Sequence, residues 1–292
     1  MTLRHYKIFL AVCDTMNMTA AAQSLFLSQS AVSQAVAEME KHYGVRLFER
    51  MSRRLYLTPA GKKLLNYANQ IVRVDLEAEN NMRSQQKNGS VRVGASVTIG
   101  AYVLPKLVSR YQSQMPETDV FVYEDNTTKI EAMLLGGQLD LALVEGEIAS
   151  PDLVTKPFLS DRLTLICGMN HRFVGLSEVK AAELEKETFI MREKGSGTRK
   201  TFEDEMAAQS LTWREGWTCN NADTIKLAVQ QGLGVSVISR RAAESEAADK
   251  KLCMVQVQGM RFQRWFKTAY HKEKYLTDAM LRMIEMCHSC DF

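Results

Sequence analysis

Two short helical patterns follow each other almost without a linker between residues 19 and 39, and this arrangement constrains the fold more than any other feature of the sequence. The small residues 20–22 allow a neighbouring helix to approach closely, and Thr19 is a candidate N-cap for the first helix. Ser28 is a candidate N-cap for the second helix, whose apolar residues recur at helical spacing. That stripe consists of Ala31, Val32, Ala35, Val36 and Met39. With a further helix expected over residues 3–15, the pattern predicts a helix-turn-helix.

The opposite face of the second helix carries short polar side chains near its start. They are Gln29, Ser30, Ser33 and Gln34. Such side chains reach base edges in the major groove of DNA, where an amide can bond adenine at two positions and a hydroxyl can donate or accept. We therefore predict that this helix is a recognition helix. A polar surface on an ordinary small bundle is the alternative that this segment alone leaves open.

A basic hairpin is expected directly after the recognition helix. Gly44 ends that helix, and residues 45–48 and 55–57 have the composition of short strands. The tip between them contains Arg50, Arg53 and Arg54. These arginines are expected to meet phosphates or the minor groove, because such contacts require positive charge on a reachable projection. A solvated charged loop is the alternative.

The charge is divided unevenly along the chain. Residues 1–88 contain 12 Lys and Arg but 7 Asp and Glu, a formal net charge of +5, which leaves −2 on residues 89–292. This asymmetry predicts that the N-terminal part binds a polyanion while the remainder has another role. Because 46% of the residues are hydrophobic and 24% are charged, the chain is neither disordered nor fibrous.

Length and hydropathy indicate a cytoplasmic protein of at least two domains. The 292 residues exceed one typical domain, and no run approaches the roughly 18 consecutive apolar residues of a membrane span. The N-terminus also lacks the pattern of a signal peptide. We expect the six scattered cysteines to remain thiols, and we expect no metal site, because the Cys287–Cys290 pair has no second pair of ligands.

A long helix is expected after the hairpin. Thr58 and Pro59 supply an N-cap and a first-turn proline, and no helix breaker follows before Asn88 and Gly89. A narrow apolar seam runs along this helix at alternating spacings of three and four residues, and it contains Leu64, Tyr67, Ile71, Val74 and Ala78. A seam of this width requires a partner helix, so we predict a dimer.

Strand and helix patterns alternate through the C-terminal two hundred residues, which predicts a mainly parallel sheet in two similar lobes around one cleft. The expected strands are 91–95, 120–124, 139–144, 163–167, 188–191, 217–221 and 235–238. A single helix is expected from residue 96 to about residue 111. Ligands of open α/β sheets bind at the carboxyl ends of strands. The polar residues at such ends are Ser96, Thr98, Asn126, Thr127 and Glu145.

The segment 192–199 has the pattern of an anion-binding turn. It follows an expected strand and precedes a helix over residues 200–208, so Gly195 and Gly197 allow backbone N–H groups to converge on a ligand. The residues expected to contact an anion here are Arg192, Gly195, Ser196, Gly197, Thr198 and Arg199. A plain turn with a capped helix is the alternative. A second turn between strand and helix, residues 220–224, contains Asn221 and offers further N-terminal amides, although Asp223 could occupy them as an internal cap.

Four segments within the first 65 residues closely resemble the LysR-type transcriptional regulators. They are Thr-Ala-Ala at 19–21, Ser-Gln-Ser-Ala-Val-Ser-Gln at 28–34, Leu-Phe-Glu-Arg at 47–50 and Leu-Thr-Pro-Ala-Gly at 57–61. The family often has proline where Ser30 stands. The resemblance implies that an interrupted inverted repeat of double-stranded DNA is bound by Thr19, Ser28, Gln29, Ser30, Ser33, Gln34, Arg50, Arg53 and Arg54.

The same resemblance implies three parts. These are a winged helix-turn-helix over residues 1–57, a dimerising linker helix over 58–88, and an effector-binding domain over 89–292 that is similar to periplasmic binding proteins. Its lobe I is expected to comprise residues 89–162 and 267–292, and its lobe II residues 163–266. The run from Arg192 to Arg199 is similar to the branch with CysL-like and CbbR-like regulators, which respond to small sulfur oxyanions or to phosphorylated or carboxylated metabolites. A homodimer that pairs into a homotetramer is also implied.

Three classes of function compete for this chain. A regulator that responds to a small anion explains the basic N-terminal part, the seam helix and the two-lobed C-terminal part together. A cytoplasmic enzyme acting on an anionic substrate leaves residues 1–88 unexplained, and no nucleophile has an evident base in the sequence. A two-lobed binding protein would share only the C-terminal part, residues 89–292. We therefore expect a transcriptional regulator without a cofactor or catalytic residues.

Overall fold

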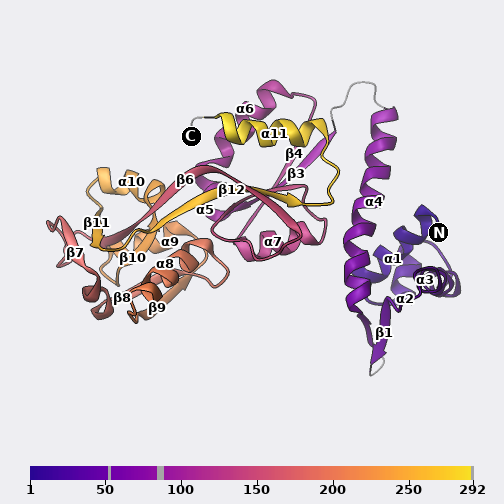
Figure 1. Ribbon diagram of the computed structural model, residues 1–292, viewed down its shortest axis with the longest axis horizontal. Helices are drawn as coiled ribbons and strands as arrows, with labels where there is room; N and C mark the ends of the chain where they lie inside the picture. The colour runs from indigo at the N-terminus through magenta and orange to yellow at the C-terminus, as the bar shows by residue number, and fades with distance from the viewer. Residues whose placement is uncertain (52–53, 84–88, 291–292) are drawn as a thin grey trace. The chain divides into compact units, whose positions relative to one another are not determined.

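The computed structural model describes residues 1–51, 54–83 and 89–290, without the side chains of residues 80–83 (Figure 1). The chain divides into two compact units. One comprises Met1–Gly89 together with Leu135–Gln138, and the other comprises Ser90–Leu134 and Leu139–Phe292. Within the described ranges, no helix is both long enough and apolar enough to span a bilayer.

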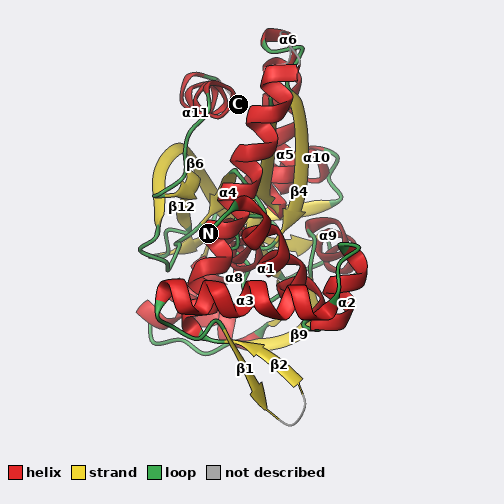
Figure 2. Cartoon of the chain, turned by 90° about the vertical axis from the view of Figure 1, so that its right-hand side faces the viewer, coloured by secondary structure: helices red, strands yellow, loops and turns green. Residues whose placement is uncertain are grey.

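The N-terminal unit is a winged helix-turn-helix followed by a long helix. Its elements are α1 (Leu3–Thr15), α2 (Met18–Ser24), α3 (Gln29–Tyr43), β1 (Phe48–Met51), β2 (Arg54–Leu57) and α4 (Pro59–Arg83). Helices α1 to α3 enclose a core of apolar side chains around Phe9, Val32 and Met39, all three fully buried. Figure 2 shows the antiparallel hairpin of β1 and β2 projecting beyond helix α3 within this unit.

Local side-chain bonds explain where these helices begin and end. Ser28 caps α3 as predicted, because its hydroxyl accepts from the Ala31 amide, and Gly44 ends that helix with a φ of 67°. The prediction that Thr19 is an N-cap was wrong. Asn17 has that role, since its side-chain oxygen accepts from the Thr19 and Ala20 amides at 2.9 and 3.2 Å. Asn is as good a cap as Thr and stands directly before the first helical turn.

Helix α4 begins at the predicted proline, and the Thr58 hydroxyl accepts from the Gly61 amide at 3.0 Å. The predicted apolar seam is divided between two environments. Leu64 is 9% exposed and belongs, with Ala68, to the core of the helix-turn-helix. Ile71 and Val74 are exposed at 37% and 42%. Only the later part of the seam is therefore free to meet a partner helix.

The C-terminal unit is built on one mixed sheet of eight strands, with a two-stranded sheet beside it. Its strands are β3 (Ser90–Ser96), β4 (Asp119–Asp125), β5 (Leu141–Glu145), β6 (Leu153–Gly168), β7 (Glu178–Lys180), β8 (Thr188–Arg192), β9 (Arg214–Cys219), β10 (Ser236–Ser239), β11 (Leu252–Gln258) and β12 (Gln263–His271). Its helices are α5 (Val97–Tyr102), α6 (Leu104–Gln114), α7 (Thr127–Leu135), the 3-10 helix η1 (Ala181–Lys186), α8 (Gly197–Ala208), α9 (Ala222–Gln230), α10 (Arg240–Ala248) and α11 (Asp278–Ser289).

The sheet differs from the expected mainly parallel one. Strand β3 pairs in parallel with β4 and β5, as expected, but β6 pairs antiparallel with β10, β11 and β12. The 16-residue strand β6 and the returning strand β12 both run through the region where the two lobes were expected to meet, near residues 162 and 266. The expected helix from residue 96 to 111 is two helices, α5 and α6, which are separated at Val103.

Buried side chains gather in distinct clusters on either side of this crossing. One cluster joins β3, β5, α6 and α11 around Val93, Leu107 and Met283. A second joins β6, β8, β11 and α8 around Leu165, Phe189 and Phe202, and a third lies under α9 and α10. We keep the names lobe I for residues 89–162 with 267–292, and lobe II for residues 163–266. Polar groups meet where the two sets of elements come together.

Candidate functional site

The start of helix α3 presents an exposed polar face, as the recognition-helix prediction requires. Gln29 and Ser33 are both exposed, and no hydrogen bond of their side chains to another described residue is found. Ser30 shares a hydrogen bond with the capping Ser28 at 3.0 Å. The Gln34 amide donates to Glu38 Oε1 at 2.9 Å, which holds this side chain against its own helix. Gln29 and Ser33 are therefore the side chains that are best placed to read bases.

The strands of the basic hairpin reach further toward its tip than expected, because β1 ends at Met51 and β2 begins at Arg54. Arg50 lies opposite Leu55 in the ladder, and Arg54 lies opposite Met51; both arginines are exposed. The third arginine of this prediction, Arg53, lies outside the described residues. Thr19 is exposed on the first turn of α2, where its amide bonds Asn17.

Phe26 is a residue of this unit whose exposure the sequence did not reveal. It stands in the turn between α2 and α3 with a φ of 55°, and its side chain is 96% exposed. Its neighbour Leu27 packs against the core instead. Because α3 begins shortly after this turn, an exposed aromatic ring here lies beside the predicted DNA-reading face.

Arg264 of strand β12 is the centre of a buried polar cluster between the lobes. Its Nε donates to Asp161 Oδ2 at 2.8 Å, and its Nη1 lies 3.2 Å from Glu145 Oε1. The same guanidinium donates to the Thr198 hydroxyl at 2.9 Å and to the Thr98 hydroxyl at 3.4 Å. The side chains of Arg264, Asp161 and Glu145 are at most 2% exposed. This cluster brings three predicted site residues, Thr98, Glu145 and Thr198, to one guanidinium.

Neither Arg264 nor Asp161 was among the predicted site residues. A charged residue on a strand is ordinarily solvated, and the sequence does not show that both strands have neighbours on each side. The available signal was alternation, since Arg264 lies between the apolar Phe262 and Phe266 at every second position. Charges at inward positions of a strand are rare unless they are paired.

Two buried serine hydroxyls in this region have no hydrogen-bond partner among the described residues. They belong to Ser96 and Ser196, which are 1% and 2% exposed and precede helices α5 and α8. Neither hydroxyl caps its helix. The second oxygen of Glu145, Oε2, is also buried without a partner in the described part of the chain. Buried polar atoms are normally hydrogen-bonded, so these three indicate a place for water or for a polar ligand.

The two arginines that were expected to supply charge to an anion are occupied by carboxylates. Arg199 donates to Glu203 at 2.7 Å and to both oxygens of Glu215 at 2.8 and 3.0 Å. Arg192 donates through Nε and Nη2 to Glu193 at 2.8 and 2.9 Å. Arg199 therefore ties α8 to β9, and Arg192 is paired with the residue that follows it. Arg264 is the guanidinium that contacts Glu145, whose second oxygen has no partner among the described residues.

A contact between the lobes closes one side of the cleft. The Thr128 amide of α7 in lobe I donates to the Gly195 carbonyl of lobe II at 3.2 Å, and within lobe I the Thr127 hydroxyl donates to the Glu145 carbonyl at 3.1 Å. A Cβ on Gly197 would stand 2.4 Å from the Glu145 carbonyl oxygen, so only glycine permits this approach. Next to these contacts is a hollow of about 320 Å³, which Thr127, Gly195, Ser196, Gly197 and Arg199 help to line.

Two predicted amides have structural partners. Asn126 accepts from the Lys129 amide at 3.1 Å at the start of α7. Asn221 caps α9, because its oxygen accepts from the Thr224 amide at 2.8 Å. Asp223, the expected competitor for that role, lies 3.1 Å from Lys226 instead. The cap occupies the Asn221 oxygen within lobe II, and a role of this residue in ligand binding stays a prediction.

Burial also affects the charge of the cleft. It raises the pKa of Asp161 above its usual value, while the neighbouring Arg264 and the Ser239 hydroxyl oppose that shift. At the edge of the cluster, the partly exposed Arg241 places its Nε 3.9 Å from Asp161 Oδ1. The buried cluster itself contains one guanidinium and two carboxyl groups, of which Asp161 accepts a proton more readily than an exposed aspartate.

Comparison with known proteins covers both units. Residues 3–62 match the model of the bacterial regulatory helix-turn-helix proteins of the lysR family, and residues 84–290 match that of the LysR substrate binding domain. The chain is 31% identical to the uncharacterized HTH-type transcriptional regulator YeiE of Escherichia coli K12, over 98% of this chain and 97% of that protein. It is 29% identical to the regulator CysL of Bacillus subtilis, with 88% and 87% covered. It is 31% identical to the RuBisCO operon transcriptional regulator of Allochromatium vinosum, with 95% and 92% covered.

Solved structures agree with the fold. A full-length OxyR variant from Pseudomonas aeruginosa covers all of this chain, with 96% of its own length matched, a TM-score of 0.75 and 21% identity. The regulatory domain of CcmR from Synechocystis PCC6803, in complex with 2-PG, matches 69% of this chain and 96% of its own, with a TM-score of 0.65 and 26% identity. The resemblance noted in the sequence is thus confirmed, and so is its CysL-like and CbbR-like character. The chain belongs to the LysR family of bacterial transcriptional regulators, with a DNA-binding helix-turn-helix and a two-lobed substrate-binding domain.

Proposed function

We propose that this regulator responds to a small oxyanion-bearing metabolite that binds between the two lobes beside Arg264. The observation that carries this proposal is the pair of buried hydroxyls of Ser96 and Ser196, which lie at helix starts in lobe I and lobe II and have no partner among the described residues. Both hydroxyls can donate to an anion. Helix α8 adds the backbone N–H groups of its first turn, whose dipole favours negative charge.

The cluster also limits which anions suit the cleft. With both carboxylates ionised, Arg264, Glu145 and Asp161 would together carry a net charge of −1, and Arg241 offsets this only from the edge. This net negative charge repels a simple anion that has no hydrogen-bond donor of its own. A ligand that also carries a hydroxyl group could donate to Glu145 Oε2 while its anionic end meets Arg264 and Ser196. We favour hydroxylated carboxylates and phosphorylated acids over simple inorganic ions. The 2-PG bound to the related CcmR domain supports an acidic metabolite, and sulfite and phosphate remain alternatives.

The proposal includes a homodimer, paired into a tetramer, that reads an interrupted inverted repeat of DNA with α3 and the hairpin. Its DNA-binding part rests on the exposed Gln29, Ser33, Arg50 and Arg54. Its dimeric part rests on the exposed apolar residues of α4. The predicted cytoplasmic location agrees with a DNA-binding role and stays a prediction.

A thermal-shift screen of the full chain against hydroxy acids, sugar phosphates, 2-phosphoglycolate, phosphate and sulfite would identify the ligand, because a ligand that binds only the folded state raises its stability. Calorimetry with the best ligand then compares Ser96→Ala and Ser196→Ala with wild type. Each substitution should weaken binding about tenfold, since each removes one donor to a charged group. Ser236→Ala is the matched control, because the hydroxyl of that buried serine bonds Met191 Sδ within lobe II. Unaltered affinity in both cleft variants would place the ligand elsewhere.

A further inference from the structure

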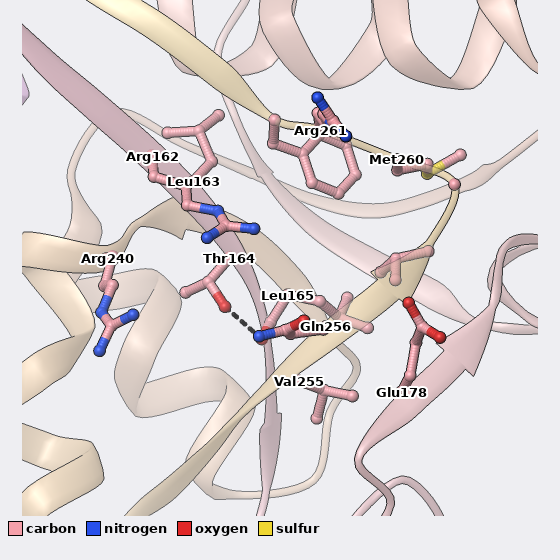
Figure 3. A pocket seen from close by; sticks show the side chains of 13 residues that line it. Arg162, Leu163, Thr164, Leu165, Glu178, Arg240, Val255, Gln256, Met260 and Arg261 are labelled. Atoms are coloured by element: carbon pink, nitrogen blue, oxygen red, sulfur yellow. Dashed lines mark hydrogen bonds between the residues drawn. The ribbon is translucent and has the colours of Figure 1, made fainter.

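A second hollow, separate from the cleft, lies mainly in lobe II, with Arg162 at its boundary, and is lined by arginines. It has a volume of about 460 Å³, and Arg162, Arg240 and Arg261 line it together with Thr164, Gln256 and Glu178 (Figure 3). Backbone and apolar atoms of β6, β11 and the 259–262 turn form the rest of its wall. Three arginines and one glutamate thus lie around this hollow.

The alternation of strand β6 separates this hollow from the cleft. Asp161 is buried and bonds Arg264 on the cleft side, whereas the next residue, Arg162, is exposed. Successive side chains of a strand point to opposite faces, so the arginine hollow lies on the other face of the strand. Arg261 stands three residues before Arg264, at the turn that enters β12. The two sites therefore share strands but no side chains.

The charges of the hollow are poorly neutralised by the protein. Among the described residues, no ion pair of the Arg162 or Arg261 side chain is found. Arg240 pairs with Glu244 at 3.1 Å, but both side chains are more than half exposed, and such pairs contribute little. A smaller neighbouring hollow is lined by Ser160, Arg162, Arg261 and Gln263, so the same two arginines also face it. Figure 3 shows Glu178 across the hollow from Arg240.

We propose that this arginine hollow binds a small polyanion of the phosphate class, a phosphate ester or pyrophosphate, as a second ligand site of the effector domain. Guanidinium groups present paired N–H donors that match phosphate oxygens, and several guanidiniums around one space repel each other until an anion binds. The Gln256 amide adds a neutral donor at its wall, while the Thr164 hydroxyl donates to the Leu165 carbonyl at 3.4 Å and can accept from a ligand. The volume lies in the range that holds a small metabolite.

Pyrophosphate is the probe for this site, titrated calorimetrically into the full-length protein. Arg162→Gln with Arg261→Gln should weaken binding at least about tenfold, because charge-assisted bonds from two guanidiniums are lost. Lys106→Gln with Arg110→Gln is the matched control, since both residues are exposed on α6 and the net charge changes equally. Equal affinity in the arginine variant and in this control would overturn the proposal.

The same titration separates this site from the cleft. Ser96→Ala with Ser196→Ala should leave pyrophosphate binding unchanged, and hydrogen exchange should slow in residues 162–165 and 255–262 of the complex. If the serine variant abolishes binding and the arginine variant does not, pyrophosphate occupies the cleft and the second site does not exist. If the serine variant binds the cleft ligand as tightly as wild type does, while the arginine variant loses pyrophosphate binding, only the proposed effector site is contradicted.

Discussion

At the scale of single residues, Arg264 decides the electrostatics of the cleft. It is the partner of two buried carboxylates and of two threonine hydroxyls that come from different lobes. A buried ion pair adds little net stability compared with apolar residues, but the loss of one partner leaves charge uncompensated in a low-dielectric interior. Thr98 and Thr198 therefore position this guanidinium, and the hydroxyls of Ser96 and Ser196, which have no partner among the described residues, are those that we propose for a ligand.

Replacing Arg264 with Gln should lower the free energy of unfolding by about 3–5 kcal/mol near neutral pH, because Asp161 and Glu145 would lose their buried cation. Burial already raises the pKa of Asp161, so the folded state holds a proton at a higher pH than the unfolded chain does. Stability linked to that group falls as pH rises through its folded pKa. The loss in Arg264→Gln should accordingly shrink on acidification, as denaturant titrations at several pH values would measure.

The control for this prediction is the double variant Arg264→Gln with Asp161→Asn. It removes one uncompensated carboxylate and should recover part of the lost stability at neutral pH. A single variant whose loss is small and independent of pH would show that the cluster is well solvated.

At the scale of elements, helix α4 has two functions that its sequence pattern does not separate. Its first turns complete the core of the helix-turn-helix through Leu64 and Ala68. Its later turns expose Ile71 and Val74 at 37% and 42%. Two exposed apolar residues at a spacing of three, on the stripe that continues from Leu64, indicate a partner helix, whereas Leu64 and Ala68 are already covered.

Ile71→Glu with Val74→Glu should dissociate the dimer while the N-terminal unit stays folded, because buried like charges would face each other across the seam. Light scattering gives the mass, and circular dichroism gives the helix content. Leu64→Glu should instead destabilise the helix-turn-helix itself. Lys63→Glu, an exposed position on the same helix, is the control and should preserve the dimer. An intact dimer in the double variant would show that Ile71 and Val74 do not form the dimer interface.

At the scale of the whole molecule, the uneven charge assigns DNA affinity to one unit. The +5 on residues 1–88 and the −2 on residues 89–292 predict that phosphate contacts come from the N-terminal unit alone. Positioning contacts and base-reading contacts should then respond differently to substitution.

Arg50→Ala and Arg54→Ala should weaken binding to all duplexes, and each should reduce the slope of log K against log salt by about 1. Gln29→Ala should keep that slope and lose preference for the operator over random DNA. Fluorescence anisotropy at several salt concentrations measures both quantities. Lys106→Gln with Arg110→Gln, in the other unit, should change neither. Equal losses on operator and random DNA for Gln29→Ala would exclude it from base reading.

Local chemistry in the sequence determined the N-terminal unit almost completely. Caps, glycine stops, the first-turn proline and apolar periodicity act within a few residues, so α3, its cap Ser28 and the start of α4 could be predicted. Thr19 was predicted as the cap, whereas Asn17, an equally good capping residue two positions earlier, has that role. The turn at 192–199 was likewise visible, because glycines and a helix start are local signals.

Only the tertiary structure decided which charges of the cleft are paired, and which turns of α4 belong to the core of the helix-turn-helix and which are exposed. Arg264 and Asp161 lie 103 positions apart, and they meet because β6 and β12 run antiparallel through both lobes. In the sequence Arg192 and Arg199 have the pattern of anion ligands, but in the structure they pair with Glu193, Glu203 and Glu215. Which charge stays unpaired depends on burial and on distant neighbours, since the same guanidinium is a ligand donor or a structural cation according to the carboxylates that the fold brings to it.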